Sequence, residues 1–351
     1  MKTILITGGS GFIGSHTCLV LLDYGYNLVV LDSHVNSSPV SSERVINLHK
    51  KKHGTSLNRL ELIAGDIRDG ELLDKIFVNS RLNQTPIEAV IHFAGLKSVE
   101  ESEQQPLLYW EVNVGGSISL FRAMETNNCR TIVFSSSATI YGPSVEQTLR
   151  EDSKISPSNT YGQTKVAIEQ ILGQLCKNSF KDWRVANLRY FNPVGSHPSG
   201  EIGENPSGKP NNLFPYISQV AVGGFEVLNI FGNDWPTPDG TGVRDYIHVM
   251  DLAEAHFSAL EYLLKSEPEL INLNIGTGKG TSVLKLLDTF EKVNGCKVPY
   301  VFADRRIGDV ASTVANNELA IATLNWQPKR SLEDICRDGW KWQKFNPSGY
   351  E

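Results

Sequence analysis

Residues 3–14 read TILITGGSGFIG, a short apolar run that ends directly in glycines. Thr3–Thr7 has the composition of a buried strand, and the apolar residues after the glycines recur at helical spacing. Gly8, Gly11 and Gly14 permit a tight turn, bring backbone N–H groups close to a pyrophosphate, and let the helix pack on the strand. This stretch therefore predicts a strand–turn–helix unit that binds a dinucleotide.

The alternation of short apolar runs and helical patterns continues through the first half of the chain. Further strands are expected at Leu28–Leu31, Leu60–Ile63, Ala89–Phe93, Thr131–Phe134 and Val185–Leu188. Helices are expected at Ile13–Tyr24, Glu71–Asn79, Pro106–Thr126 and Tyr161–Lys177. Because parallel strands need helical connections, this pattern predicts an α/β protein with a Rossmann-type doubly wound parallel sheet, covered by helices on both faces.

The amino-acid composition of the chain changes after residue 190. Pro, Gly and Asn gather in residues 192–212 and 232–242, and long irregular segments in a compact protein are usually functional loops. We expect a dinucleotide-binding domain over residues 1–190 and a smaller mixed α/β C-terminal substrate region over residues 191–351, with chain exchange between the two. In the second region we expect helices at Tyr246–Leu264 and Thr281–Asn294, and a strand at Ile271–Ile275.

Composition excludes several functional classes. The 351 residues include 33 Lys and Arg against 39 Asp and Glu, a net charge of −6 without a basic block, so nucleic acid is not an expected partner. No apolar run reaches the roughly 18 residues of a membrane span. The 5 cysteines are dispersed and form no C-x-x-C pair, which predicts free thiols, no metal site and a cytoplasmic location. His92 and His248 are expected to pack beside strands.

The cofactor can be inferred from the end of the second predicted strand. Asp32 could bind both hydroxyls of an adenosine ribose, and its carboxylate would repel the extra phosphate of NADP. Ser33 offers no cation that could receive that phosphate, so the sequence predicts NAD. Asp66-Ile67 and Phe93-Ala94-Gly95 follow the next two strands, at the carboxyl edge of the sheet where a dinucleotide lies.

Tyr161 and Lys165 form a candidate catalytic pair. Their four-residue spacing on a predicted helix places both side chains on one face. A nearby ammonium favours phenolate and lowers the tyrosine pKa from about 10, so that the phenol can exchange a proton with a substrate hydroxyl. Ser137, at the end of the fifth strand, could hydrogen-bond the same oxygen. This spacing is common by itself, but it becomes informative after a dinucleotide site.

Longer strings of sequence carry a resemblance to a known family. The chain resembles the UDP-glucose 4-epimerase family, in the extended branch of the short-chain dehydrogenase/reductase superfamily, over nearly its whole length. The matching strings are TGGSGFIGSHT from Thr7, HFAGLKSV from His92, SSSATIYG from Ser135, LRYFNPVG from Leu188, NNLFPYISQVAVG from Asn211 and IFGNDWPTPDGTGVRDYIHVMDLA from Ile230.

The resemblance implies an isomerase that interconverts UDP-galactose and UDP-glucose by transient oxidation at sugar carbon 4, through a 4-keto intermediate. The NAD would be tightly bound and regenerated in each cycle. Tyr161 would be the acid/base, Lys165 its activator and Ser137 a partner of the sugar hydroxyl. The implied NAD contacts are Gly8, Gly11, Phe12, Ile13, Gly14, Asp32, Asn36, Ser37, Asp66, Ile67, Phe93, Ala94, Gly95, Lys97, Asn113, Tyr161, Lys165 and Phe191.

The resemblance also implies a set of residues that bind the UDP-hexose, and it implies a homodimer. Arg244 and Arg306 would clamp the diphosphate, Phe231 would pack against uracil, and Asp309 would receive the uridine ribose. The dimer would be joined through the helices Pro106–Thr126 and Tyr161–Lys177. The full set of implied substrate contacts is Ser137, Tyr161, Asn192, Asn212, Leu213, Asn229, Phe231, Arg244, Arg306 and Asp309.

Two positions depart from the family pattern. Thr313 stands where the family commonly has a tyrosine, and members with a small residue there tend to accept N-acetylated sugars. Thr313 is therefore expected to act as a specificity gate that also admits UDP-N-acetylglucosamine. Val112 replaces an asparagine that often precedes the position of Asn113, which leaves one cofactor contact open.

Alternative functions can be weighed on the same residues. A nucleotide-sugar 4,6-dehydratase needs an Asp-Glu pair where this chain has Ala138 and Thr139, so dehydration is disfavoured. A catalytically silent NAD-binding regulator or scaffold could have lost its catalytic residues, but all of them are present here. Residues 276–280, GTGKG, are expected to form a turn rather than a phosphate loop, and Arg305 is expected to be a solvated surface charge.

Overall fold

The computed structural model describes residues 1–54, 59–144, 146, 148–177, 182–206, 208, 210, 212–306 and 309–351. The chain forms two compact units. Unit 1 consists of Met1–Gly142, Ile155–Arg189 and Ala253–Leu273, and unit 2 consists of Pro143–Lys154, Tyr190–Leu252 and Asn274–Glu351. The main division of the chain therefore lies next to residue 190, and each unit also takes in a segment from the other side of that division.

A seven-stranded sheet is the centre of unit 1, in the order β11-β6-β5-β4-β1-β2-β3. β1 pairs in parallel with both β2 and β4, so the strand order reverses at its carboxyl end, where α/β proteins bind their ligands. The prediction of a doubly wound sheet is confirmed. The strands are β1 Thr3–Thr7, β2 Asn27–Asp32, β3 Leu60–Ala64, β4 Ile87–His92, β5 Thr131–Ser137, β6 Arg184–Tyr190 and β11 Leu270–Ile275.

The assignment of the strand at Ile271–Ile275 to the second region is wrong, because β11 extends the central sheet beside β6. Val185 N–H donates to Glu269 O at 2.9 Å, and Asn187 Nδ2 donates to Asn272 Oδ1 at 2.8 Å. The residues of β11 do not reveal this pairing, because the partner strand β6 lies about 80 residues earlier in the sequence.

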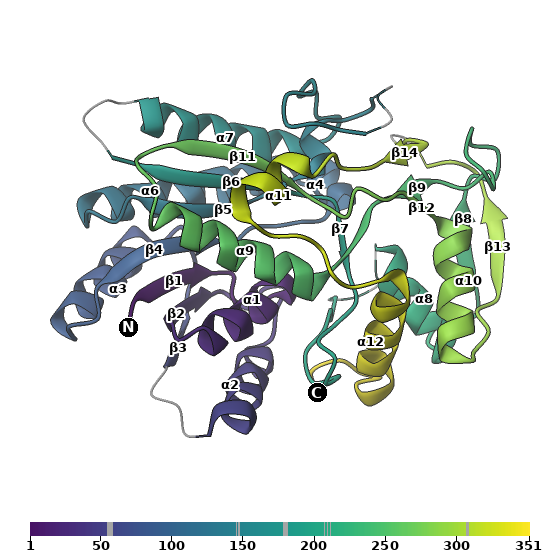
Figure 1. Ribbon diagram of the computed structural model, residues 1–351, viewed down its shortest axis with the longest axis horizontal. Coiled ribbons are helices and arrows are strands. Elements are labelled where there is room, and N and C mark those ends of the chain that lie inside the picture. The colour runs from purple at the N-terminus through teal and green to yellow at the C-terminus, as the bar shows by residue number, and fades with distance from the viewer. Residues whose placement is uncertain are drawn as a thin grey trace. The chain divides into compact units, whose positions relative to one another are not determined.

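Helices cover both faces of this sheet, with α1 and α9 in front and α3, α6 and α7 behind in the view of Figure 1. Leu73 of α3, Leu120 of α6 and Ile168 of α7 share one buried core with Val90 and Phe134 of the sheet. The helices are α1 Phe12–Asp23, α2 Pro39–His53, α3 Gly70–Leu82, α4 Val99–Gln104, α5 Pro106–Tyr109, α6 Gly116–Thr126, α7 Thr160–Lys177 and α9 Val249–Leu263, with a 3₁₀ turn at Ala138–Ile140.

The helix expected at Pro106–Thr126 is interrupted by a π-helical turn, Trp110–Gly115, between α5 and α6. Single π-helical turns inside α-helices often lie at functional sites. This turn carries Asn113, whose side chain is fully buried. The apolar spacing on either side of the turn conceals the one extra residue, which is why the periodicity predicts one uninterrupted helix.

Among its described residues, unit 2 contains short strands, four helices and the first residues of α9. Its elements are β7 Asn192–Val194, α8 Leu213–Ala221, β8 Leu228–Phe231, β9 Val243–Arg244, β10 Tyr246–His248, β12 Thr281–Ser282, α10 Val283–Asn294, β13 Tyr300–Ala303, β14 Ser312–Thr313, α11 Glu318–Leu324, α12 Leu332–Phe345 and the start of α9. The helices expected from Tyr246 and from Thr281 both begin later, because their first residues pair as β10 and β12.

Candidate active site

The glycine turn after β1 has the geometry that a dinucleotide needs. Gly8 has a φ of 72°, and a Cβ on it would lie 2.6 Å from Ala94 N. A Cβ on Gly14 would lie 2.4 Å from Gly8 O, so both positions exclude a side chain. α1 begins at Phe12 after Gly11, and no side chain caps it. Its first N–H groups are therefore available to an anion, with the positive end of the helix dipole behind them.

Asp32 is held in place at the end of β2. Its Oδ2 accepts from Ser10 N–H at 2.9 Å, and its Oδ1 accepts from His34 N–H at 3.0 Å and from Ser37 Oγ at 2.7 Å. A carboxylate has about four acceptor positions, so it can accept these bonds and still bind a ribose hydroxyl. Asp32 also ties the glycine turn to the segment that contains Ser37, while Asn36 is exposed beside it. These donors and acceptors fit the diphosphate and ribose of NAD.

The predicted NAD contacts after β3 and β4 differ in their burial and in their bonds to other residues. The carboxylate of Asp66 accepts three hydrogen bonds from Arg68, and the guanidinium holds the pKa of Asp66 below its usual value. Ile67 is buried, and Lys97 is exposed. Phe93 lies against the His256 ring with the centroids 4.8 Å apart, at the same strand end as Ala94 and Gly95.

The side chain of Asn113 is hydrogen-bonded within the protein. Its Oδ1 accepts from Leu96 N–H at 2.8 Å, and its Nδ2 donates to Leu96 O at 3.0 Å and to Thr164 Oγ1 at 3.2 Å. The π-helical turn thus ties the loop after Gly95 to α7. We interpret Asn113 as a residue that positions the cofactor loop.

Tyr161, Lys165 and Ser137 lie together where β5 ends beside α7. Lys165 Nζ donates to Ser135 O at 2.7 Å and lies 5.7 Å from the centroid of the Tyr161 ring. The hydroxyl of Ser137 interacts with the phenol of Tyr161 and lowers its pKa. The backbone N–H of Tyr161 donates to the buried hydroxyl of Ser102 in α4 at 3.2 Å. The catalytic side chains expected from the sequence therefore converge.

Burial governs the electrostatics of this cluster. It raises the pKa of Tyr161 to about 12 and lowers the pKa of Lys165 to about 8. In the protein alone, the expectation that Lys165 brings the phenol pKa down is not met, because removal from water outweighs the other effects. The ammonium points to a backbone carbonyl, and the hydroxyl of Ser137 is the group that lowers the tyrosine pKa.

In unit 2, four predicted substrate residues, two of them arginines, form one cluster. Arg244 NH1 donates to Val310 O at 2.9 Å, and Arg306 Nε donates to Asp309 Oδ2 at 3.1 Å. The guanidinium of Arg306 lies over the Phe231 ring, 4.7 Å from its centroid. Asp309 also lies 3.9 Å from Arg244, so the two cations share one carboxylate. An aromatic face beside two planar cations is suited to a base and its phosphates.

The remaining predicted substrate residues occupy separate elements of unit 2. Asn192 begins β7, and Asn229 lies on β8 next to Phe231. Asn212 precedes α8, whose first residue is Leu213, and its Nδ2 donates to Glu204 Oε1 at 3.0 Å. The predicted NAD contact Phe191 also falls in this unit and is buried.

Thr313 lies beside Arg244 because β14 pairs in parallel with β9. Ser312 is opposite Val243, and Thr313 is opposite Arg244. Residues in register on neighbouring strands project to the same face, so the proposed gate shares a face with the arginine expected to bind the diphosphate.

Arg305 is exposed, as expected for a surface charge, but it is bonded to neighbouring residues. Its Nε donates to Asp234 Oδ1 at 2.7 Å, and its guanidinium lies over the Trp235 ring, 3.9 Å from the centroid. The planar guanidinium can stack and bond at the same time, which a sequence pattern does not reveal. Arg305 therefore ties the loop after β8 to the end of β13.

The turn at residues 276–280 is fastened by a carboxylate that the sequence did not single out. The buried Asp245 accepts from Thr277 N–H at 2.8 Å, Gly278 N–H at 2.9 Å and Ala315 N–H at 3.2 Å. Burial raises the pKa of Asp245 even so. The glycines therefore serve a turn around a carboxylate, with no anion site of their own.

The prediction of no metal site overlooked one histidine pair. His49 and His53 lie one turn apart on α2, and their ring nitrogens face Asp23 Oδ1 at 2.8 and 3.1 Å. Lys52 Nζ bonds the other oxygen of Asp23 at 2.6 Å. The Asp23 carboxylate thus already has three hydrogen-bonding partners, and the basic end of α2 opposes a further cation.

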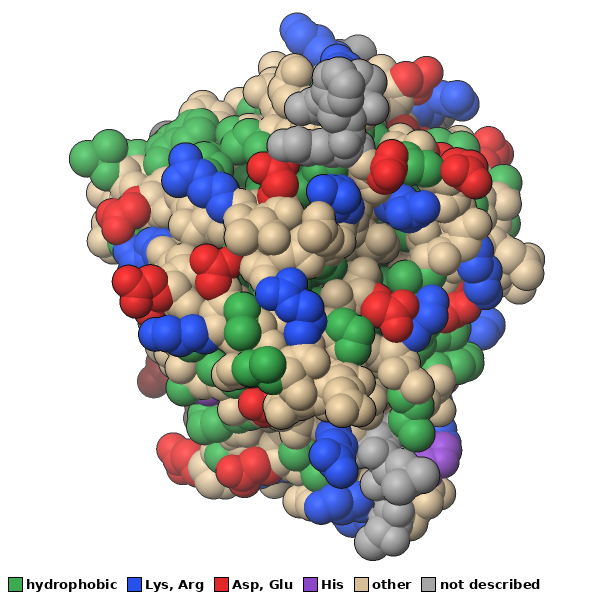
Figure 2. Space-filling model, turned by 90° about the vertical axis from the view of Figure 1, so that its left-hand side faces the viewer, with side chains coloured by type: hydrophobic (Ala, Val, Ile, Leu, Met, Phe, Trp, Pro, Cys, Tyr) green, Lys and Arg blue, Asp and Glu red, His purple; other side chains and the backbone are tan. Residues whose placement is uncertain are grey.

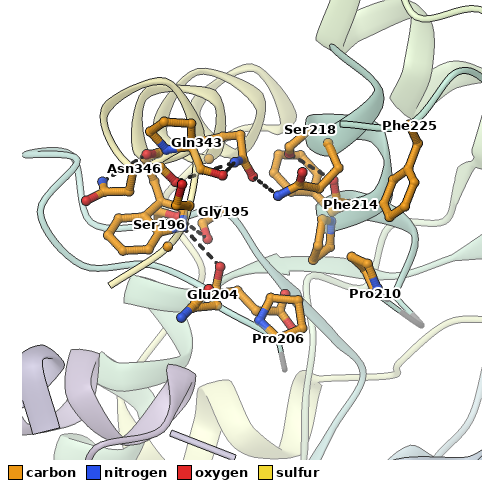
Figure 3. Close-up of a pocket in the computed structure, with 18 of the residues that line it drawn as sticks. Gly195, Ser196, Glu204, Pro206, Pro210, Phe214, Ser218, Phe225, Gln343 and Asn346 are labelled. Carbon is orange, nitrogen blue, oxygen red and sulfur yellow. Dashed lines mark hydrogen bonds between the residues drawn. The ribbon is translucent and has the colours of Figure 1, made fainter. Parts of the chain in front are cut away.

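A cavity of about 220 Å³ opens elsewhere in unit 2, and none of the predicted site residues lines it. Figure 3 shows Phe214 and Ser218 of α8 on one side and Gln343 and Asn346 at the end of the chain on the other. Gln219 Nε2 donates to Gln343 Oε1 at 3.3 Å, and Asn346 Nδ2 donates to Gly200 O at 2.9 Å. These bonds fasten α12 to α8 and Asn346 to the loop before α8, and the polar groups offer no cluster of charge for a nucleotide.

The surface charge and the length of the helices are relevant to nucleic acid and membranes as possible partners. On the face in Figure 2, basic and acidic side chains are interspersed among the coloured atoms and form no continuous basic area. Every helix in the described residues is too short or too polar to cross a membrane. The cysteines Cys18, Cys129, Cys176, Cys296 and Cys336 are all free thiols.

Comparison with known proteins agrees with this architecture over the full chain. Residues 4–276 match the family described as "NAD dependent epimerase/dehydratase family". UDP-glucose 4-epimerase of Bacillus subtilis is 51% identical, with 99% of this chain and 98% of the relative covered. UDP-glucose 4-epimerase 2 of Arabidopsis thaliana is 50% identical, with coverage of 99% and 97%.

Solved structures show the same agreement in three dimensions. The structure of UDP-glucose-4-epimerase from Stenotrophomonas maltophila, with bound NAD and formylated UDP-arabinopyranose, superposes with a TM-score of 0.93. That protein is 43% identical, and 99% of each chain is covered. These full-length similarities agree with the glycine turn and with the convergence of Ser137, Tyr161 and Lys165. The chain belongs to the NAD dependent epimerase/dehydratase family.

Proposed function

We propose that this chain interconverts UDP-galactose and UDP-glucose, as an NAD-dependent epimerase that acts at carbon 4 of the hexose. The observation that carries the proposal is the convergence of Ser137, Tyr161 and Lys165 at the end of β5, in the same unit as the glycine turn and Asp32. Relatives about 50% identical over almost the full chain carry the name UDP-glucose 4-epimerase.

The residues of unit 1 would carry the proton transfers. When bound, NAD supplies the hydride acceptor and donor, so that the reaction has no net redox change. Tyr161 takes the proton of the 4-hydroxyl and later returns it, while Ser137 donates a hydrogen bond to the same oxygen. Lys165 would place a positive charge near the phenol, which opposes the effect of burial on the Tyr161 pKa. The resulting 4-keto sugar must turn over before it is reduced on its other face.

The arginine cluster of unit 2 would hold the nucleotide. Arg244 and Arg306 would bind the diphosphate, with Phe231 against uracil and Asp309 on the uridine ribose. Asn192, Asn212, Leu213 and Asn229 would complete the contacts. Charged clamps on the nucleotide, with few ligands to the hexose, suit a sugar that must present both faces.

Thr313 extends the proposal to N-acetylated sugars. Thr313 is in register with Arg244, and a threonine side chain is smaller than the tyrosine that the family commonly has there. We expect UDP-N-acetylglucosamine to be a second substrate. Thr313→Tyr should reduce its turnover at least tenfold, which corresponds to about 1.4 kcal/mol, and should leave UDP-glucose turnover within about twofold. Equal losses for the two sugars would contradict the gate.

A homodimer and a cytoplasmic location are also part of the proposal. Leu107 and Trp110 are 83% and 39% exposed on the helical segment that the family is expected to use as its interface. Leu107→Glu should dissociate the dimer in sedimentation analysis, whereas Leu82→Glu, also on an exposed leucine (74%), should not. The free cysteines support a reducing compartment.

One experiment separates the proposed function from its rivals. The protein is purified without added NAD, its bound cofactor is recorded, and interconversion of UDP-galactose and UDP-glucose is assayed. Epimer formation with retained NAD is the expected result. A stable 6-deoxy-4-keto product would instead indicate a dehydratase, which Ala138 and Thr139 disfavour, and retained NAD without turnover would indicate a silent binding protein.

A further inference from the structure

The polar face of α7 that carries Tyr161 and Lys165 continues one turn beyond Lys165. Tyr161, Lys165 and Glu169 are spaced by four residues, so they lie along one side of the helix. Lys165 Nζ donates to Ser135 O at 2.7 Å, and Glu169 Oε1 accepts from Ser136 Oγ at 2.5 Å. Consecutive residues of β5 are thus bonded by successive turns of α7, and Glu169 provides one of these bonds.

Glu169 is also one half of a buried ion pair. Arg189 on β6 donates from Nε to Oε1 at 3.1 Å and from NH2 to Oε2 at 2.8 Å. The two side chains are only 3% and 8% exposed. Arg189 NH1 donates to Tyr141 OH at 3.0 Å and so extends the network to the residues after β5. A buried ion pair is seldom more stabilising than apolar residues of the same size, so stability alone is a weak explanation for it.

Lys165 provides a better explanation for the pair. Its ammonium lies 4.9 Å from the centroid of the Phe134 ring and 5.7 Å from that of the Tyr161 ring, and burial together with this charge lowers the pKa of His92 on β4. Burial lowers the pKa of Lys165, and the charge of Glu169 acts in the opposite direction. Arg189 fixes the Glu169 carboxylate, so that it influences Lys165 through space while it remains bonded to Ser136.

We propose that Glu169, held by Arg189, is a positioning residue for Lys165 that balances the buried ammonium and fixes α7 against the catalytic end of β5. The inference rests on the proposed function for its kinetic consequence. It extends that function by assigning the buried Glu169–Arg189 ion pair a role in the electrostatics of Lys165.

The test is the pH profile of Glu169→Gln, assayed as the holoenzyme with UDP-galactose. The amide keeps the shape of the side chain and removes its charge. Because a lost carboxylate makes the Lys165 ammonium easier to deprotonate, the alkaline limb of kcat should move about one unit to lower pH, with kcat near that limb about tenfold lower. KM for UDP-galactose should change less than about twofold, because Glu169 touches no substrate.

Two further variants separate positioning from a merely structural role. Tyr141→Phe removes one hydrogen bond to Arg189 and keeps the Glu169 charge, so it should lower stability without moving the pH limb. Glu169→Asp keeps the charge on a shorter side chain and should retain the wild-type limb at reduced kcat. An alkaline limb that stays in place in folded Glu169→Gln overturns the proposal. If that variant does not fold, a displaced limb in Glu169→Asp overturns it.

A readout without turnover distinguishes this inference from the proposed function. The free energy of unfolding is compared between wild type and Lys165→Met from pH 7 to pH 11, and the comparison is repeated in the Glu169→Gln background. A shift of the Lys165 titration to lower pH in that background supports the electrostatic role even if the wild type epimerises nothing. No shift overturns the inference even if the enzyme is active.

Discussion

The requirement for glycine in the turn after β1 can be tested by comparing Gly8, before α1, with Gly25, after α1. Gly8 and Gly25 both have positive φ, 72° and 90°. A Cβ on Gly8 would lie 2.6 Å from Ala94 N and 2.9 Å from Ala94 Cα, whereas a Cβ on Gly25 would meet nothing within 4 Å. Gly8→Ala therefore combines backbone strain with a clash, and Gly25→Ala shows the strain alone.

The magnitudes follow from these contacts. Left-handed backbone costs a residue with a Cβ about 1–2 kcal/mol, which is the whole effect expected for Gly25→Ala. In Gly8→Ala, the end of β4 must also retreat from β1. Phe93 N–H and Ala94 N–H both donate to Thr7 O, at 2.9 and 3.0 Å, so the movement weakens both bonds. At about 0.5–1.5 kcal/mol each, they add about 1–3 kcal/mol to the cost.

The assay is urea unfolding of both variants and wild type, with NAD content measured on the same preparations. Gly8→Ala should lose more unfolding free energy than Gly25→Ala by the clash contribution, and should release NAD because the start of α1 moves with Gly8. Gly25→Ala should keep its cofactor. Equal destabilisation by the two variants would refute the claim that the close approach of β1 and β4 requires glycine.

Two further predictions concern the buried catalytic pair. Tyr161→Phe should lose about 10²–10⁴-fold in kcat because the phenyl ring cannot exchange a proton, while NAD content, read from the absorbance of the released cofactor, stays at the wild-type level. Lys165→Met should be inactive but more stable than wild type at pH 7, by about 1–3 kcal/mol in urea unfolding. The sign follows from the lowered pKa: the unfolded chain gains the Lys165 proton near pH 10.5 and the folded chain only near pH 8, so wild type loses stability as pH falls through that window. The advantage of Lys165→Met should therefore be largest below pH 8, and an advantage that is constant from pH 7 to pH 11 would contradict the assignment of this cost to the ammonium.

The first unit was predictable because its signals are local. A strand such as Thr3–Thr7 and the glycines after it specify their own conformation, and repetition of that unit specifies the sheet. β11 was assigned to the wrong region because its partner β6 lies far away in the sequence, and pairing between distant strands leaves no periodic sign. The π-helical turn at Trp110–Gly115 adds only one residue to the helical repeat, and the spacing of apolar residues does not reveal so small a change.

The candidate site was predictable in its residue types and less so in its electrostatics. Tyr161 and Lys165 were identified from spacing, but burial of both groups determines their pKa values, and burial depends on the whole fold. Arg305 resembles any surface arginine until Asp234 and Trp235 are folded beside it. A sequence signal for Glu169 did exist, since it follows Lys165 by four residues, although its ion-pair partner Arg189 cannot be inferred from spacing.

The boundary between β5 and α7 concentrates groups that a protein selected for stability alone would not bury together. Lys165 is removed from water, and Glu169 and Arg189 form an enclosed ion pair where apolar residues would be no less stable. The hydrogen bonds of Ser135 and Ser136 to α7 fix the register of strand and helix, and a catalytic site needs its groups held within about 0.5 Å. Proton transfer requires that accuracy, since a hydroxyl must meet the phenol at hydrogen-bond distance. The large apolar core behind this boundary, shared by α3, α6 and α7, supplies the stability that lets one polar face of α7 be arranged for chemistry.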